Sequence, residues 1–323
     1  MPGAVASTGD CDSRSKGSSV RALVLITLLL AGRAEAEVTG DLSLLTKVAA
    51  LQKKNLDAIE QWSGRAELKF RKRSPEGYDL TYSVDARFWH DAVARASCFS
   101  WLITESSTRF DARENLVNSL QGHRAGELQL GEDYYIMPLS AVKPDYVPVV
   151  QLVPRREPTF GSVSQKFYPM SYFRIWNEKS EEFFARKLKY SGEEWMHIHI
   201  RQEGQQVLLD TGGARYPEFR KQYVFDLSQN GLLVKFEARD PKRGESQRQT
   251  YREFSGVYLP VHTVYRNARF DGTDVSEKEV HWKDQTLNEP IPEESFTLEA
   301  MGVPAGAQVV DIQTRQTYRY APP

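Results

Sequence analysis

Cysteine is scarce in this sequence. Cys11 and Cys98 are the only two in 323 residues, and Cys11 falls in a segment that we expect to be removed. A disulfide framework is therefore excluded. The residues around Cys98, from Ala96 to Trp101, are small or aromatic. That setting is typical of a buried, unreactive thiol rather than a nucleophile.

An excess of charge of either sign is also missing. The 42 lysines and arginines nearly balance the 43 aspartates and glutamates, which gives a formal net charge of −1 at pH 7. A near-neutral chain lacks the basic surface that binds phosphate backbones or anionic bilayers. We therefore expect no nucleic-acid partner.

The sequence has no apolar run long enough to span a bilayer, which takes about 20 residues. The run Ala22–Gly32 is shorter, follows Arg14, Lys16 and Arg21, and precedes the small-residue pattern Ala34-Glu35-Ala36. This combination predicts a secretory signal peptide over residues 1–36, cleaved near Ala36. Translation from near Val20 would leave a compact signal and the same mature protein. No cysteine stands at the predicted cleavage point after the run, so no lipid anchor is predicted.

The mature part, residues 37–323, is then expected to be a single domain. Its predicted location is the periplasm or another extracytoplasmic compartment, and the mature chain is not expected to span a membrane.

Motifs of catalysis are missing as well: the sequence has no Gly-x-Ser-x-Gly, Walker, Gly-x-Gly-x-x-Gly or His-Glu-x-x-His pattern. His197 and His199 share one face of a predicted strand, but no further ligand accompanies them, so we predict no metal. Asp210-Thr211-Gly212 resembles an aspartic protease loop, yet that chemistry needs a second such carboxylate and the sequence has none. We interpret the triplet as a turn after a strand. No enzyme activity, catalytic residue or cofactor is predicted.

Two segments have the 3.6-residue periodicity of amphipathic helices. In Leu42–Trp62 the apolar stripe is interrupted by Gln52, and Asp41 or Ser43 can cap its start. The segment Ser171–Tyr190 carries aromatic and aliphatic residues among charges and predicts a second helix.

Most of the remaining chain alternates with a period of two, as half-buried strands do. Residues 66–70 and 78–88 form a hairpin pattern, and strands at 223–227, 232–239, 248–254, 257–267 and 275–284 follow with short turns. Such turns predict an antiparallel meander, because parallel strands need long crossovers. Between them, 100–108, 126–129 and 134–137 are candidate short strands. The predicted class is mainly β (α+β).

Several late segments resemble the LolA-like family of periplasmic lipoprotein carriers and outer-membrane lipoprotein-sorting proteins. The resemblance covers residues 40–320 in element order, and its sharper motifs lie within 220–312. They are Tyr223-Val224-Phe225-Asp226, Tyr251-Arg252-Glu253-Phe254, Gly256-Val257-Tyr258-Leu259-Pro260, Asn288-Glu289-Pro290-Ile291-Pro292 and Gly306-Ala307-Gln308-Val309-Val310-Asp311.

The resemblance implies a strongly curved antiparallel sheet, an incomplete β-barrel covered by amphipathic helices, whose concave face holds acyl chains. The implied partners are acyl chains or lipoproteins, with an envelope protein as a further possible partner. Two alternatives stay open. The apolar side chains of the concave face could form an ordinary filled core, and the protein could be a structural, interaction or sensor module without a lipid ligand. The candidate cavity residues are Phe70, Tyr82, Val84, Phe88, Val234, Phe236, Val257 and Leu259.

Overall fold

The computed structural model describes residues 38–110, 120–141, 148–154, 183–185, 196–213 and 218–322. The predicted signal peptide lies outside these ranges, as does most of the predicted helix at 171–190, of which residues 183–185 are described and helical. The helical elements with defined bounds are α2 (Ser43–Asp57), η3 (Leu227–Gln229) and η4 (Glu293–Phe296). The strands are β1 (Val38–Gly40), β2 (Gln61–Arg73), β3 (Tyr78–Asp91), β4 (Ala96–Phe110), β5 (His123–Leu130), β6 (Asp133–Ala141), β7 (Val149–Pro154), β8 (Met196–Glu203), β9 (Gln206–Gly213), β10 (Arg220–Asp226), β11 (Leu232–Arg239), β12 (Arg243–Phe254), β13 (Val257–Arg269), β14 (Val275–Leu287), β15 (Gln308–Asp311) and β16 (Thr317–Arg319).

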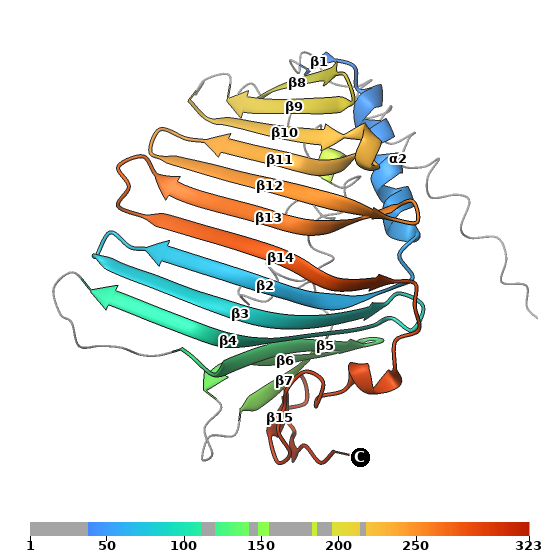
Figure 1. The fold of residues 1–323 in the computed structure, drawn as a ribbon, viewed down its shortest axis with the longest axis vertical. Coiled ribbons are helices and arrows are strands. Elements are labelled where there is room, and N and C mark those ends of the chain that lie inside the picture. Colours follow the sequence, from blue (N-terminus) through green and yellow to red (C-terminus); the bar gives the residue numbers. More distant parts are fainter. Residues whose placement is uncertain are drawn as a thin grey trace, which may run out of the picture.

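These strands form one 16-stranded sheet in the order β1-β8-β9-β10-β11-β12-β13-β14-β2-β3-β4-β5-β6-β7-β15-β16 (Figure 1). Neighbours pair antiparallel except at two places, where β1 lies parallel to β8 and β15 parallel to β7. In both places a strand near one end of the chain joins a strand distant in sequence. The candidate short strands at 100–108, 126–129 and 134–137 are confirmed and lie within β4, β5 and β6.

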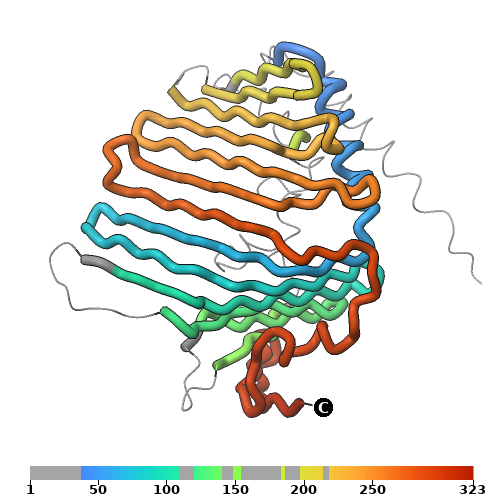
Figure 2. Tube along the Cα trace, viewed as in Figure 1, coloured from blue at the N-terminus to red at the C-terminus, as the bar shows by residue number. Residues whose placement is uncertain are grey.

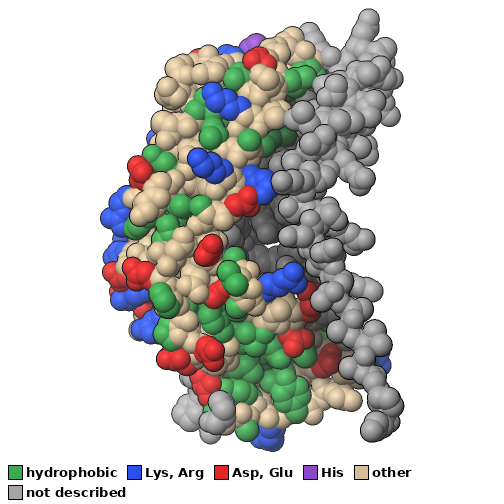
Figure 3. Space-filling view, turned by 90° about the vertical axis from the view of Figure 1, so that its right-hand side faces the viewer, with side chains coloured by type: hydrophobic (Ala, Val, Ile, Leu, Met, Phe, Trp, Pro, Cys, Tyr) green, Lys and Arg blue, Asp and Glu red, His purple; other side chains and the backbone are tan. Residues whose placement is uncertain are grey.

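The sheet is curved and does not close. Its two edges are β1 and β16, and β14 pairs with β2 although some 200 residues separate them, so early and late strands lie side by side (Figure 2). Turned by 90°, Figure 3 shows a bent wall with charged side chains gathered along its convex, left-hand margin. The predicted mainly β class and curved, unclosed sheet are confirmed.

Alternation along the strands separates two faces. In β2, Ala66 and Leu68 are buried while Glu67 and Lys69 are exposed. Val84 of β3 pairs with Leu68, and Val280 of β14 pairs with it from the other side. Because successive side chains point to opposite sides, the apolar rows of neighbouring strands coincide on one face, here called the core face. The other, charged side is called the outer face.

Helix α2 covers one part of the core face. It packs against β8, β9 and β11, and Leu45 and Val48 are buried there. Asp41 Oδ1 accepts a hydrogen bond from Ser43 N at 2.9 Å, which satisfies one free amide of the first turn. The helix ends at Asp57, before the predicted Trp62, because Trp62 belongs to β2, which pairs with β3 and β14.

The polar positions of the α2 stripe are hydrogen-bonded to turns of the sheet. Gln52 Nε2 donates to Gly231 O at 2.6 Å. Asn55 Nδ2 donates to Tyr258 O at 3.0 Å, and Asn55 Oδ1 accepts from Tyr258 N at 2.8 Å and from Asn230 Nδ2 at 2.9 Å. Buried amides need such partners, so the polar interruption of the apolar stripe fixes the helix on the β10–β11 and β12–β13 turns.

The segment after β14 packs on the outer face of β4–β7. Met301 and Val303 are buried there against Cys98 and Leu128. The predicted burial of Cys98 is confirmed, and burial raises the pKa of its thiol to about 12. No helix in the described part of the chain combines the length and hydropathy that crossing a bilayer requires.

Candidate ligand-binding face

The core face of the central strands carries one continuous apolar cluster, called cluster 1. It runs from β11 through β12, β13, β14, β2, β3 and β4 to β5. A second cluster, cluster 2, lies under α2 on β8–β11 and includes Phe183, Phe225 and Phe236. The buried members of cluster 1 are Ile59, Trp62, Ala66, Leu68, Val84, Ala86, Phe88, Phe99, Trp101, Ile103, Ala125, Leu232, Tyr251, Val257, Leu259, Val280 and Trp282.

Aromatic rings stack edge to face in the middle of cluster 1. The Phe88 ring lies 5.0 Å from Trp62 and 5.4 Å from Trp282, at 70° and 79° between planes. Phe88 pairs with Gly64, and a Cβ built on Gly64 would lie 2.9 Å from the Phe88 ring. Glycine there leaves room for the ring, so this centre is closely packed.

The eight predicted wall residues divide into two groups. Phe70, Tyr82, Val84, Phe88, Val234, Val257 and Leu259 belong to cluster 1 or pack against it, and Phe236 belongs to cluster 2. Phe236 and Val234 lie on the same face of β11, but Phe236 packs into cluster 2 and Val234 against cluster 1.

Burial divides the same residues a second time. Val84, Phe88, Phe236, Val257 and Leu259 are at most 5% exposed, whereas Phe70, Tyr82 and Val234 are half-buried. The side chains with accessible surface are therefore Phe70, Tyr82 and Val234.

Phe70 and Tyr82 belong to a row that crosses four strands towards the β2–β3 turn. Tyr265 pairs with Lys278, Lys278 with Phe70, and Phe70 with Tyr82. The Phe70 and Tyr82 ring centroids are 4.6 Å apart. Lys278 Nζ lies 5.9 Å from the Phe70 centroid and 5.5 Å from that of Tyr265, within cation–π range.

This aromatic–lysine row combines apolar surface with one cation. Burial raises the pKa of Tyr82 and of Tyr265 to about 12, so both hydroxyls stay protonated at neutral pH. The row can therefore offer ring faces to a hydrocarbon chain and an ammonium to an acidic group. Sequence reasoning missed Tyr265 and Lys278, although both lie in predicted strands.

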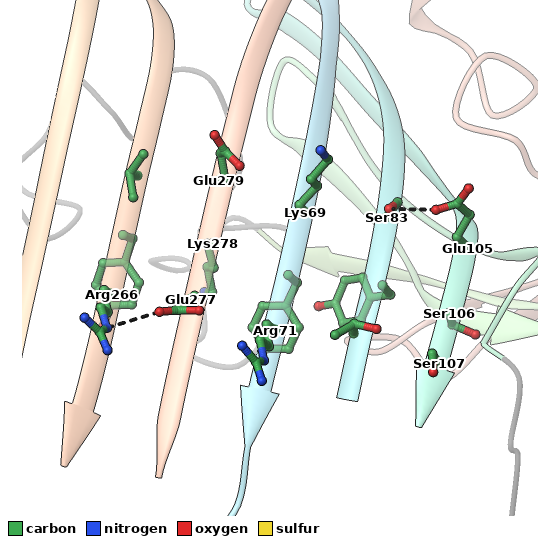
Figure 4. Close-up of a pocket in the computed structure, with 15 residues that line it drawn as sticks. Lys69, Arg71, Ser83, Glu105, Ser106, Ser107, Arg266, Glu277, Lys278 and Glu279 are labelled. Atoms are coloured by element: carbon green, nitrogen blue, oxygen red, sulfur yellow. Dashed lines mark hydrogen bonds and ion pairs between the residues drawn. The ribbon is translucent and has the colours of Figure 1, made fainter. Parts of the chain in front are cut away.

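An open groove of about 560 Å³ crosses β13, β14, β2, β3 and β4 (Figure 4), and the residues of the aromatic–lysine row are among those that line it. Its charges are largely paired: Arg266 Nε lies 3.1 Å from Glu277 Oε1, and Ser83 donates to Glu105 at 3.3 Å. A second groove of about 950 Å³ lies across β8–β13 and is also lined mainly by polar side chains. The second groove has the character of a solvated surface.

The ionisable groups weighed for catalysis, Asp210, His197 and His199, lie on the face opposite to the core face. Asp210, Thr211 and Gly212 are inside β9 rather than in a turn, so that interpretation was wrong. The Asp210 carboxylate accepts from Gln222 Nε2 at 2.8 Å and forms an ion pair with Arg201. His199 Nδ1 lies 2.7 Å from Thr39 Oγ1. These contacts are structural partnerships within the sheet.

Comparison with known proteins found similarity in solved structures alone. No family model and no curated protein sequence matches the chain. A LolA superfamily protein from Nitrosomonas europaea is similar at 14% identity and a TM-score of 0.36, covering 79% of this chain and 99% of that one. A putative outer membrane lipoprotein-sorting protein domain from Vibrio parahaemolyticus is similar at 10% identity and a TM-score of 0.42, covering 80% and 99%. The family named from sequence motifs is thus also that of these neighbours. At such scores nothing about ligands follows from the likeness.

Proposed function

We propose that this protein binds acyl chains of lipids or lipoproteins on its core face, as a non-enzymatic carrier outside the cytoplasm. The observation that supports it is the apolar cluster 1 on the concave side of an unclosed sheet, bordered by the half-buried aromatic–lysine row. The predicted signal peptide and the sequence resemblance to LolA-like proteins point the same way.

The energetics favour a long hydrocarbon ligand. Each methylene removed from water contributes about 0.8 kcal/mol to binding. The binding free energy of an acyl chain therefore grows with the number of methylenes that contact the apolar wall. Lys278 would face the acidic or ester end of the ligand, with the Phe70 and Tyr265 rings beneath it. Ligand sites typically pair such apolar walls with few polar groups.

A second candidate function has its own supporting observation. Five of the eight predicted wall residues are at most 5% exposed, as expected of a filled core. On that account the protein is a structural or interaction module, and its partner is an envelope protein. The two functions differ in whether an apolar small molecule binds at all.

Replacing Phe70 by alanine is expected to weaken binding of a fluorescent fatty acid about tenfold or more. The loss of ring contact with the chain needs to cost only ~1.4 kcal/mol for that change. Binding is measured by fluorescence titration of the purified mature protein, and urea unfolding of the same samples checks that the variant is folded.

Phe270→Ala is the matched control, because Phe270 is 54% exposed and lies outside both core-face clusters. It should bind like the wild type. No binding by the wild type would contradict the proposed function. Equal affinities of the wild type and both variants would mean that the aromatic–lysine row is not part of the binding site.

A further inference from the structure

Two histidines and a glutamate meet on the outer face of β13 and β14. His262 pairs directly with His281 across the two strands, and Glu279 precedes His281 by two positions. The residues between them, Thr263 and Val280, are 3% and 2% exposed and point to the core. The three polar side chains therefore share the opposite face.

Both imidazoles approach the same carboxylate oxygen. His262 Nε2 lies 3.0 Å and His281 Nε2 3.1 Å from the same oxygen, Glu279 Oε1. The two imidazole rings are stacked, with centroids 4.4 Å apart and 15° between planes. All three ligand atoms lie within 4.8 Å of one another, and they form the only such group of three in the described residues.

This spacing suits a small metal ion. Tetrahedral zinc with bonds of about 2.0–2.1 Å separates its ligand atoms by about 3.3–3.4 Å. To bind one ion, the observed Nε2–Oε1 distances of 3.0 and 3.1 Å need to open by a few tenths of an ångström, and the two stacked rings need to rotate so that both Nε2 lone pairs point at the metal. Cross-strand pairing holds the rings without a long loop, so little ordering is required on binding.

The chemistry of the three side chains limits which metal ions the site can bind. Two imidazoles and one carboxylate match zinc and neighbouring transition metals rather than magnesium or calcium, which prefer oxygen ligands. The side chains are 35%, 41% and 41% exposed, so an ion can enter from solvent.

The surroundings leave a fourth position available. Glu67 pairs with His281 from β2, but Lys283 Nζ lies 2.6 Å from its carboxylate. A metal held by His262, Glu279 and His281 would therefore take water, or a group from a binding partner, as its fourth ligand.

We propose that His262, Glu279 and His281 form a binding site for a divalent transition metal of the zinc class. It departs from the sequence prediction of no metal and involves other histidines than His197 and His199. The site lies on the face opposite to cluster 1, so it can fail or succeed independently of the proposed acyl-chain function.

Isothermal titration of the tag-free mature protein with zinc chloride tests this site. One zinc ion should bind per chain. His262→Ala and His281→Ala should each weaken binding by at least about tenfold, since even groups that only orient metal ligands contribute 10–100-fold to affinity. Glu279→Gln should weaken it while keeping the size of the side chain.

The double variant His197→Ala/His199→Ala is the control, because it removes two histidines from β8 and leaves His262, Glu279 and His281 intact. It should bind zinc like the wild type, and circular dichroism should report the same fold for all variants. Absence of zinc binding by the wild type would overturn the proposal. So would loss of zinc binding in His197→Ala/His199→Ala while the His262, Glu279 and His281 variants still bind zinc.

Discussion

Replacing Phe236 by alanine is expected to lower the free energy of unfolding by about 3–5 kcal/mol, the usual cost of removing a packed aromatic ring. Phe236 is 2% exposed and its ring lies 5.0 Å from that of Tyr223 at 34°. It belongs to cluster 2, which α2 covers with Leu45 and Val48. Deleting the ring would leave a cavity that the surrounding strands cannot easily fill.

Urea unfolding of the mature protein measures this loss, with Phe270→Ala as control. Phe270 is 54% exposed and has the Arg239 guanidinium 5.0 Å from its ring, so its removal should cost about 1 kcal/mol or less. A loss of 3–5 kcal/mol at Phe236 marks the α2 end of the concave face as filled core. A loss no larger than that of the control would mean that Phe236 lines an empty wall.

Replacing Gly126 by valine is expected to release the C-terminal segment from the outer face. A Cβ at this position of β5 would lie 2.3 Å from Met301 Cγ and 2.9 Å from the backbone oxygens of both Met301 and Phe99. Backbone atoms cannot swing aside as a side-chain end can. The expected cost is about 3 kcal/mol, at the upper end for overpacking, because burial of Met301 and Val303 is lost as well.

Limited proteolysis detects this change, since a released segment is cleaved more readily. Cleavage should become faster between η4 and β15, around residues 297–307. Gly244→Val is the matched control, because a Cβ there would meet only the edge of the Phe270 ring, at 3.3 Å. An unchanged cleavage pattern for Gly126→Val would contradict the described packing of the C-terminal segment, with Met301 and Val303, on the outer face of β4–β7.

The strands could largely be predicted because their polarity alternates. Glu67 and Lys69 around Leu68 fix both the extended conformation and the inward face of β2, and the same holds in β3 and β11. Asn230-Gly231 is a typical hairpin sequence and lies in the β10–β11 turn, where both residues have positive φ, 54° and 67°.

Contacts between distant segments could not be predicted in the same way. The parallel pairings of β1 with β8 and of β15 with β7 depend on where the ends of the chain return. Neither pairing leaves a periodic signal in either strand. The docking of Met301 on β5 likewise depends on the bare backbone of Gly126, which a hydropathy pattern does not reveal.

The candidate site was only half predictable for a related reason. Selecting apolar strand residues finds Phe70 and Tyr82 but passes over Lys278, whose charged end lies over an aromatic ring. The His262–His281 pair depends on strand register. The sequence Asp271-Gly272-Thr273-Asp274 is typical of a hairpin turn, and counting outward from its centre between Asp271 and Gly272 brings these two histidines opposite each other.

Native mass spectrometry of the protein purified from the envelope of its natural host tests whether acyl chains are bound. We expect a folded species heavier than the mature chain by the mass of one or more acylated molecules. Those molecules should be released on unfolding, and the emptied protein should then bind fluorescent fatty acid. A protein recovered only at the mass of its own chain, and unable to bind fatty acid, would contradict the acyl-chain function.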